Sequence, residues 1–158
     1  MRRTIVSFAK AQECTDNVSR CVRVSPATTA SIRCHGTPSR RGKTTTTSLI
    51  AGIFSKAKLD PTIINGGVLN SFKDSAKLGK SKWCVLESDE SDGSFIKVPP
   101  TYAIVTNIDR EHMDYYKSMQ HLKNLFIEFI SKVPSFGKTF ICIDNKNNLE
   151  ILKKIKIK

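Results

Sequence analysis

The sequence lacks long apolar runs and paired cysteines. Its apolar stretches, such as Ala103–Val105 and Ile141–Ile143, fall far short of the roughly 20 residues that a membrane-spanning helix needs, which excludes a transmembrane protein. The five cysteines are odd in number, have no C-x-x-C spacing and follow no secretory signal, so neither a zinc site nor a disulfide framework is supported. We therefore expect a reducing, cytoplasmic location and no membrane partner.

Acidic residues are scarce. The chain has 14 of them against 26 lysines and arginines, a net charge of +12, so nucleic acid, anionic lipid and phosphate-bearing small molecules are all open as partners. Half of this excess lies in residues 1–41. Nucleic acid is the less favoured partner, because Phe8 is the one aromatic residue among the early arginines, whereas stacking platforms would require aromatic residues interleaved with them. A basic, non-catalytic polyanion-binding protein stays open as an alternative function.

The chain of 158 residues fits a single domain and divides into three segments. Residues 1–41 keep no helical or strand period and predict a disordered or non-native leader, with an organellar targeting segment as the alternative. Residues 42–147 are periodic and predict the folded domain. Residues 148–158 form a Lys-rich tail, which we expect to be frayed and solvated.

Helices and strands alternate in the periodic segment. Leu49, Ile50, Ile53, Phe54 and Ala57 form one apolar helical stripe, which Asp60-Pro61 ends. A second, clearer stripe runs from Met119 to Val133, with Ser118 as N-cap and Pro134 just past its end. Short strands are predicted at Thr62–Ile64, Trp83–Leu86, Thr101–Thr106 and Thr139–Ile143. This alternation predicts an α/β fold, a mainly parallel sheet flanked by helices.

Gly42-Lys43-Thr44 opens the first of these helices and matches the phosphate-binding end of a P-loop. There the helix N-terminus presents free N–H groups, the Lys reaches the β and γ phosphates, and the Thr hydroxyl can hold Mg²⁺. The full pattern G-x-x-x-x-G-K-[ST] fails, because Thr37 takes the first glycine position, and no uninterrupted apolar strand precedes it. A plain helix start is the alternative interpretation.

Two polar clusters follow predicted strands. Glu87-Ser-Asp-Glu-Ser-Asp-Gly-Ser94 comes directly after Trp83–Leu86, and Thr106-Asn107-Ile-Asp-Arg-Glu-His112-Met-Asp114 follows the next strand. Carboxyl ends of parallel strands meet beside the helix N-terminus, where carboxylates can share Mg²⁺ with ATP. Taken singly, the acidic run could be an ordinary surface loop and His112 a structural histidine. Their position on one predicted rim, together with Gly-Lys-Thr, favours a nucleotide site.

Four ordered motifs resemble the central ATP-binding domain of the Mur ligases. The four motifs are Gly42-Lys-Thr-Thr-Thr-Thr-Ser48, Gly66-Gly-x-x-Asn-Ser71, Glu87-Ser-Asp-Glu-Ser-Asp-Gly-Ser-Phe95 and Thr106-Asn-Ile-Asp-x-x-His112-x-Asp114. The resemblance covers about residues 42–147. Within the family, Asp-Glu-Ser-Asp-Gly-Ser-Phe favours the members that add L-alanine to UDP-N-acetylmuramate over the tripeptide-recycling and folylpolyglutamate-type members.

The resemblance implies a three-domain, ADP-forming ligase of peptidoglycan synthesis, of which this chain has the middle domain. ATP and Mg²⁺ are the implied cofactors, and UDP-N-acetylmuramate and L-alanine the implied substrates. Gly42, Lys43, Thr44 and Thr45 would bind ATP. The residues implied in catalysis are Lys43, Glu87 and His112. The implied metal ligands are Thr44, Glu87 and His112. The sugar-nucleotide site would be lined by Ser94 and Asn107.

The loop before Gly42 departs from the family. Where the family reads Gly-Thr-His-Gly-Lys-Thr, this chain has Gly36-Thr37-Pro-Ser-Arg-Arg-Gly42, so four residues replace one. We expect this change to redirect the N–H groups that would cradle phosphate. A decayed or frameshifted gene is one origin of such a chain, and we expect the isolated chain not to catalyse ligation.

Overall fold

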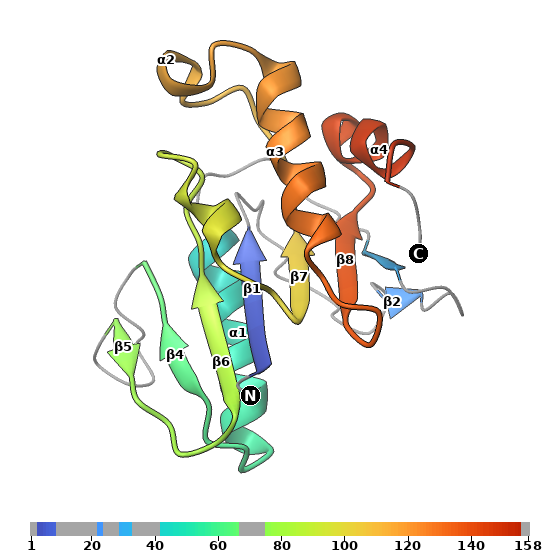
Figure 1. Cartoon of the computed structure of the whole chain (residues 1–158). Helices are drawn as coiled ribbons and strands as arrows, with labels where there is room; N and C mark the ends of the chain where they lie inside the picture. The colour runs from blue at the N-terminus through green and yellow to red at the C-terminus, as the bar shows by residue number, and fades with distance from the viewer. Residues whose placement is uncertain (1–2, 9–21, 24–28, 33–41, 67–74, 156–158) are drawn as a thin grey trace.

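The computed structural model describes residues 3–8, 22–23, 29–32, 42–66 and 75–155, and Figure 1 shows their arrangement. The elements in chain order are β1 (Arg3–Phe8), β2 (Val22–Arg23), β3 (Thr29–Ile32), α1 (Gly42–Lys56), β4 (Thr62–Ile64), β5 (Ala76–Lys77), β6 (Trp83–Glu87), the 3-10 helix η2 (Ser94–Lys97), β7 (Tyr102–Val105), α2 (Met113–Tyr116), α3 (Met119–Ser131), β8 (Lys138–Cys142) and α4 (Lys146–Leu152).

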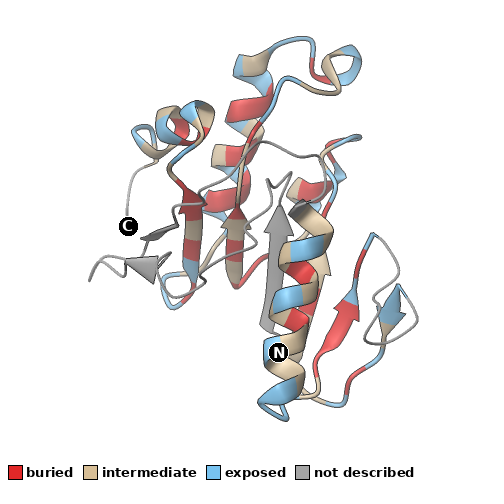
Figure 2. Ribbon diagram, turned by 180° about the vertical axis from the view of Figure 1, so that it is seen from behind, coloured by how far each residue is buried: buried red, intermediate tan, exposed pale blue. Residues whose placement is uncertain are grey.

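The strands form one eight-stranded sheet in the order β2-β3-β8-β7-β1-β6-β4-β5. Neighbours from β3 to β4 pair in parallel, whereas β2 and β5 pair antiparallel at the two edges. Helix α1 lies on one side of the sheet and α3 on the other (Figures 1 and 2). The predicted α/β class with a mainly parallel sheet is therefore confirmed, and the four predicted strands agree with β4, β6, β7 and β8 to within a residue or two at each end.

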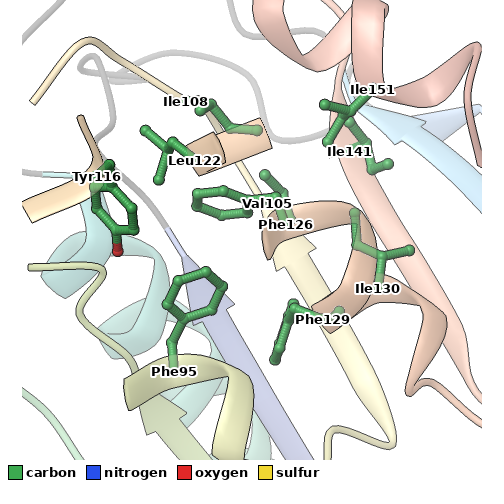
Figure 3. Packing of buried hydrophobic residues seen from close by; sticks show 11 residues of the cluster. Phe95, Val105, Ile108, Tyr116, Leu122, Phe126, Phe129, Ile130, Ile141 and Ile151 are labelled. Atoms are coloured by element: carbon green, nitrogen blue, oxygen red, sulfur yellow. The ribbon is translucent and has the colours of Figure 1, made fainter. Parts of the chain in front are cut away.

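The main core fills the space between the sheet and α3. Phe126 and Phe129 of α3 pack against Phe95 of η2 with ring centroids 5.0 and 5.7 Å apart. Other buried members come from β7, β8, α2 and α4, and Figure 3 shows the packing. The helix starts as predicted, since the Ser118 side chain accepts a hydrogen bond from the His121 N–H at 3.1 Å. The apolar stripe of α3 is therefore the face that the helix buries against the core.

Helix α1 presents a different face to the sheet from the one that its apolar stripe predicts. Leu49 and Ile53 are 54 % and 62 % exposed, whereas Thr47 and Ala51 are fully buried, and Ala51 clusters with Ile63 of β4. Figure 2 shows the exposed residues along the outward side of the helix. The stripe prediction was therefore wrong in part: Ile50 and Phe54 are half-buried, and Phe54 packs on Trp83 of β6 with ring centroids 5.1 Å apart, whereas Leu49 and Ile53 stay outside.

The first segment also differs from expectation, since three strands come from residues 1–41. Strand β1 lies in the middle of the sheet between β6 and β7, and β3 pairs with β8. Thr4, Ile5 and Val6 have high β propensity, but a central strand with parallel partners on both sides does not need to alternate. Its local sequence therefore carries no periodic signal. The rest of the expected leader lies outside the described residues.

The end of the domain also lies further along the chain than predicted. Helix α4 spans residue 147, the expected boundary, and places Asn148 and Ile151 at 0 % exposure. The Lys-rich composition hid this short helix, because only these two of its side chains are fully buried. No helix among the described residues combines the length and apolar character needed to cross a membrane.

Candidate functional site

The candidate site lies at the edge of the sheet where α1 begins and the parallel strands end. Helix α1 starts at Gly42, while β4 ends at Ile64 and β6 at Glu87. Figure 1 shows the arrowheads of these strands and the start of α1 at the same edge. Ligands of parallel α/β sheets bind outside the carboxyl ends of the strands, so the location fits the predicted nucleotide site.

Thr44 and Glu87 meet at this edge. The Thr44 hydroxyl donates to Glu87 Oε1 at 3.1 Å, and the Gly66 N–H donates to Glu87 Oε2 at 2.8 Å. Each carboxylate oxygen therefore has its own donor. One comes from the first turn of α1 and the other from the loop after β4.

The Thr44 and Glu87 oxygens fit a magnesium ion. Mg²⁺ takes hard oxygen ligands at 2.0–2.1 Å in octahedral geometry, which puts neighbouring ligand oxygens about 2.9 Å apart. Thr44 Oγ1 and Glu87 Oε1 are 3.1 Å apart. A hydroxyl and a carboxylate at this separation can occupy two adjacent coordination positions, with the rest left to water and phosphate oxygens.

Lys43 forms an ion pair in the same region. Its Nζ lies 2.6 Å from Glu90 Oε2 and 3.4 Å from Asp89 Oδ1, and the Lys43 and Glu90 side chains are only 17 % and 15 % exposed. Burial would lower the pKa of Lys43, but the hydrogen bonds and charges of Glu90 and Asp89 outweigh it and raise the pKa above its ordinary value. The ammonium thus stays charged, and an incoming phosphate has to compete with two carboxylates for it.

His112 lies beside the same two acids. The ligand atoms of Asp89, Glu90 and His112 all fall within 4.8 Å of one another, and His112 precedes α2 with a left-handed φ of 54°. Burial would raise the pKa of Asp89, but the Ser91 N–H and the Lys43 ammonium, followed by His112, lower it below its ordinary value. The structure thus groups His112 with two acids at the site edge.

The Glu90 loop is anchored to α2. The hydroxyl of Tyr116, which is 1 % exposed, donates to the backbone oxygen of Glu90. Burial and the nearby Glu90 carboxylate raise the pKa of Tyr116 above its ordinary value, so its hydroxyl keeps the proton that it donates. This contact fixes the backbone that carries the partner of Lys43.

Two asparagines of α4 hold the loop after β7. The Asn148 Nδ2 donates to the backbone oxygens of Thr106 and Cys142, both at 2.9 Å, and the Asn147 Nδ2 donates to the Ile108 oxygen at 2.6 Å. One side chain thus joins the carboxyl ends of β7 and β8. The loop from Thr106 to His112 therefore begins at a backbone oxygen that Asn148 holds.

The remaining predicted residues have local roles in the structure. Asn107 donates to Asp109 Oδ2 at 2.6 Å, and Ser94 is the exposed first residue of η2, whose N–H donates to Asp92 Oδ1 at 2.9 Å. Thr45 is exposed on α1. The structure therefore brings Lys43, Thr44 and Glu87 to one edge, with His112 in the neighbouring cluster.

Sequence reasoning missed Gly66, Asp89 and Glu90 as individual site residues. The acidic run after β6 was recognised, but composition does not tell which of its carboxylates turns toward the lysine. Gly66 follows from register: β4 and β6 pair in parallel with Ile64 opposite Leu86, so the residues that follow both strands lie alongside each other. A register prediction would have placed Asn65 opposite Glu87 and Gly66 one residue further along.

In a P-loop, the sequence G-x-x-x-x-G-K-[ST] links a strand to the helix that follows it. Strand β3 is the nearest described strand before α1, but β8, β7 and β1 lie between it and β6 in the sheet. The segment 36–41, in which we expect the replaced loop residues to redirect the N–H groups, lies outside the described residues.

Comparison with known proteins agrees with this geometry. The sequence model of the Mur ligase middle domain matches residues 40–158. The chain belongs to the Mur ligase family. Among curated relatives, UDP-N-acetylmuramate--L-alanine ligase of Pelagibacter ubique is 78 % identical over 117 residues, which are 74 % of this chain and 25 % of that protein. The enzyme of the same name from Parvibaculum lavamentivorans is 56 % identical over 104 residues, 66 % of this chain and 21 % of that protein.

Solved Mur ligases share the fold. UDP-N-acetylmuramate-alanine ligase from Thermotoga maritima superposes with a TM-score of 0.65 at 18 % identity, covering 95 % of this chain and 27 % of that one. UDP-N-acetylmuramate:L-alanyl-gamma-D-glutamyl-meso-diaminopimelate ligase from Neisseria meningitides gives a TM-score of 0.66 at 21 % identity, covering 96 % and 42 %. The resemblance to the Mur ligases is confirmed, and the chain spans about a quarter of the length of the curated relatives it matches.

Proposed function

We propose that this chain is the nucleotide-binding and magnesium-binding part of an ADP-forming ligase that joins L-alanine to UDP-N-acetylmuramate. The observation that carries the proposal is the Thr44–Glu87 pair at the start of α1, with oxygens 3.1 Å apart, in a Mur ligase middle domain. The names of the two curated relatives supply the substrates. Because ATP is a cytoplasmic metabolite, we propose a cytoplasmic location.

Each residue has a role in this proposal. Lys43 would leave Glu90 and donate to the β and γ phosphates of ATP, and the N–H groups at the start of α1 would face the same phosphates. Thr44 and Glu87 would hold Mg²⁺, which neutralises charge on the transferred phosphoryl group when bound. His112 would hold or orient a second metal. Thr45 would add a contact to ATP, and Ser94 and Asn107 would line the sugar-nucleotide site.

The chemistry is amide formation in two steps. ATP phosphorylates the lactyl carboxylate of UDP-N-acetylmuramate, and the amine of L-alanine then attacks the acyl phosphate and displaces inorganic phosphate. Lys43 balances negative charge on the phosphoryl group as it moves. Another Mur-type ligase remains the alternative within the family, whereas a basic polyanion-binding protein is not favoured, because the two curated relatives carry a ligase name.

The binding test uses the 158-residue chain and a matched version in which residues 38–41 are replaced by one histidine. We expect the restored version to bind ATP in the presence of Mg²⁺ by calorimetry, and Lys43→Ala or Glu87→Ala to abolish that binding. Lys117→Ala is the control, because this lysine is exposed and its ammonium donates to the Asp114 backbone oxygen rather than to a predicted site residue. Unchanged binding in both site variants would contradict the assignment.

Turnover is assayed separately. Ligation depends on holding the carboxylate, the γ-phosphate and the amine together, an effect worth roughly 7 to 11 kcal/mol when complete. We propose that this requires parts of the relatives beyond the matched region, so we expect the 158-residue chain alone to release no phosphate. Phosphate release that needs both UDP-N-acetylmuramate and L-alanine and is lost in Lys43→Ala would show this expectation to be wrong.

A further inference from the structure

The Glu87 carboxylate is held from two sides by donors of different kinds. The Thr44 hydroxyl donates to Oε1 at 3.1 Å, and the Gly66 backbone N–H donates to Oε2 at 2.8 Å. A hydroxyl that coordinates a metal turns a lone pair toward the ion and its hydrogen away from it, so its hydrogen bond to a carboxylate oxygen on the same ion is weakened. When metal binds, Gly66 is then the donor, within the described part of the chain, whose hydrogen bond to Glu87 is not weakened in this way.

Gly66 lies unusually close to this carboxylate. A Cβ on residue 66 would lie 3.2 Å from Glu87 Oε2 and 3.3 Å from both Cδ and Oε1. These distances are tighter than ordinary van der Waals contact, so the whole carboxylate would have to shift by a few tenths of an ångström. A magnesium ion needs near-ideal octahedral geometry and is sensitive to such a shift.

The placement of Gly66 follows from the fold. Strands β4 and β6 run parallel with Ile64 opposite Leu86, so Gly66, two residues past that pair, comes alongside the end of β6. Continuing this register puts Asn65 opposite Glu87 and Gly66 one residue further along, from where its N–H reaches Glu87 Oε2. A small residue is needed here because the β4 loop and the carboxylate pass each other at the same level of the sheet edge.

We propose that Gly66 is the positioning residue for the metal ligand Glu87: its N–H fixes Oε2, which leaves Oε1 to bind Mg²⁺ beside the Thr44 hydroxyl. The missing Cβ lets the carboxylate occupy that place. This inference rests on the proposed function, since it concerns the same magnesium site. Groups that orient a metal ligand typically change metal affinity by 10- to 100-fold when they are altered.

The test compares two glycine-to-alanine variants in the restored chain described above. Gly66→Ala keeps the N–H and adds only the Cβ. Gly52→Ala is the matched control, because a Cβ there meets nothing within 4 Å. Mn²⁺ binding is measured directly by electron paramagnetic resonance, and ATP binding is measured with and without Mg²⁺. Circular dichroism checks the fold of each variant.

We expect Gly66→Ala to weaken Mn²⁺ binding and to raise the Mg²⁺ concentration for half-maximal ATP binding by about tenfold. ATP binding without metal should stay the same, and Gly52→Ala should match the parent chain. Equal metal affinity in Gly66→Ala and the parent would overturn the positioning role alone. Absence of metal-dependent binding in the parent would overturn the proposed function together with it.

A second measurement covers the case in which Gly66→Ala does not fold. The amide proton resonance of Gly66 is compared between the parent chain and Glu87→Gln, which keeps the shape of the side chain and removes its charge. A charge-assisted hydrogen bond is stronger than a neutral one, so we expect the Gly66 resonance to move upfield in the variant. A resonance that does not move would overturn the proposal.

Discussion

Asn148 offers a test of how the site edge is held together. This residue is fully buried, and its Nδ2 donates to the backbone oxygens of Thr106 and Cys142 at 2.9 Å each. Leaving a buried hydrogen-bonding group without its partner costs about 1–3 kcal/mol. The Asn148 Oδ1, however, is buried without a partner, so Asn148→Ala also removes one unsatisfied atom. We expect Asn148→Ala to lower the free energy of unfolding by about 2 kcal/mol.

Asn148→Asp separates the hydrogen bonds from the shape of the side chain. The introduced carboxyl has the same size, but when ionised it has no proton to donate and places its charge beside two carbonyl oxygens. Burial and these oxygens raise the pKa of that carboxyl in the folded state above the unfolded value of about 3.9. A raised pKa in the folded state means that the folded state binds the proton more strongly. The free energy of unfolding of Asn148→Asp therefore falls as pH rises from about 4, the unfolded pKa, to the higher pKa of the folded state, and is constant above it.

Urea unfolding of both variants, followed by circular dichroism between pH 5 and pH 8, measures these effects. At pH 8, Asn148→Asp should be less stable than Asn148→Ala, and the gap should narrow toward pH 5, where the protonated carboxyl can donate one hydrogen bond. An aspartate variant as stable as the alanine variant at every pH would refute the reasoning, because the two carbonyl contacts would then contribute nothing.

Two further changes test the core and the lysine ion pair. Phe126→Ala should lower the free energy of unfolding, measured with urea, by about 3–5 kcal/mol, because this ring is 2 % exposed in the main core. The control is Phe136→Ala, which removes a ring that is 64 % exposed and should change the free energy of unfolding by less than about 0.5 kcal/mol. Glu90→Gln should tighten ATP binding without metal by a few-fold in calorimetry, because Lys43 no longer has to leave a charged partner at 2.6 Å; weaker binding would mean that Glu90 assists the nucleotide instead.

Features set by local sequence could be predicted. Helix α3 depends on its own apolar period and on Ser118, whose hydrogen bond to the His121 N–H spans three residues, so a short window contains the whole signal. Thr44 and Glu87 were also predicted to meet, because carboxyl ends of parallel strands share an edge with helix N-termini whatever the strand order. These inferences need no knowledge of which strands are neighbours.

Features set by long-range pairing could not be predicted in the same way. Strand β1 is stabilised by partners far along the chain, and its own six residues carry no period. Gly66 reaches Glu87 through the register of β4 and β6. The ion pair of Lys43 with Glu90 depends on how the loop after β6 folds back, which Tyr116 fixes from α2. Each of these needs a pairing that composition and spacing leave open.

The orientation of α1 connects its packing to the site. At 100° per residue, Thr47 and Ala51 lie within about 60° of Thr44 around the helix, whereas Leu49 and Ile53 lie about 140° to 180° away. The buried face is therefore the one that carries Thr44. Turning Leu49 and Ile53 inward would bury more apolar area, but it would carry the Thr44 hydroxyl away from Glu87. The inward position of Thr47 and Ala51 thus goes with a Thr44 hydroxyl 3.1 Å from the carboxylate, and the exposure of Leu49 and Ile53 is the cost of that placement.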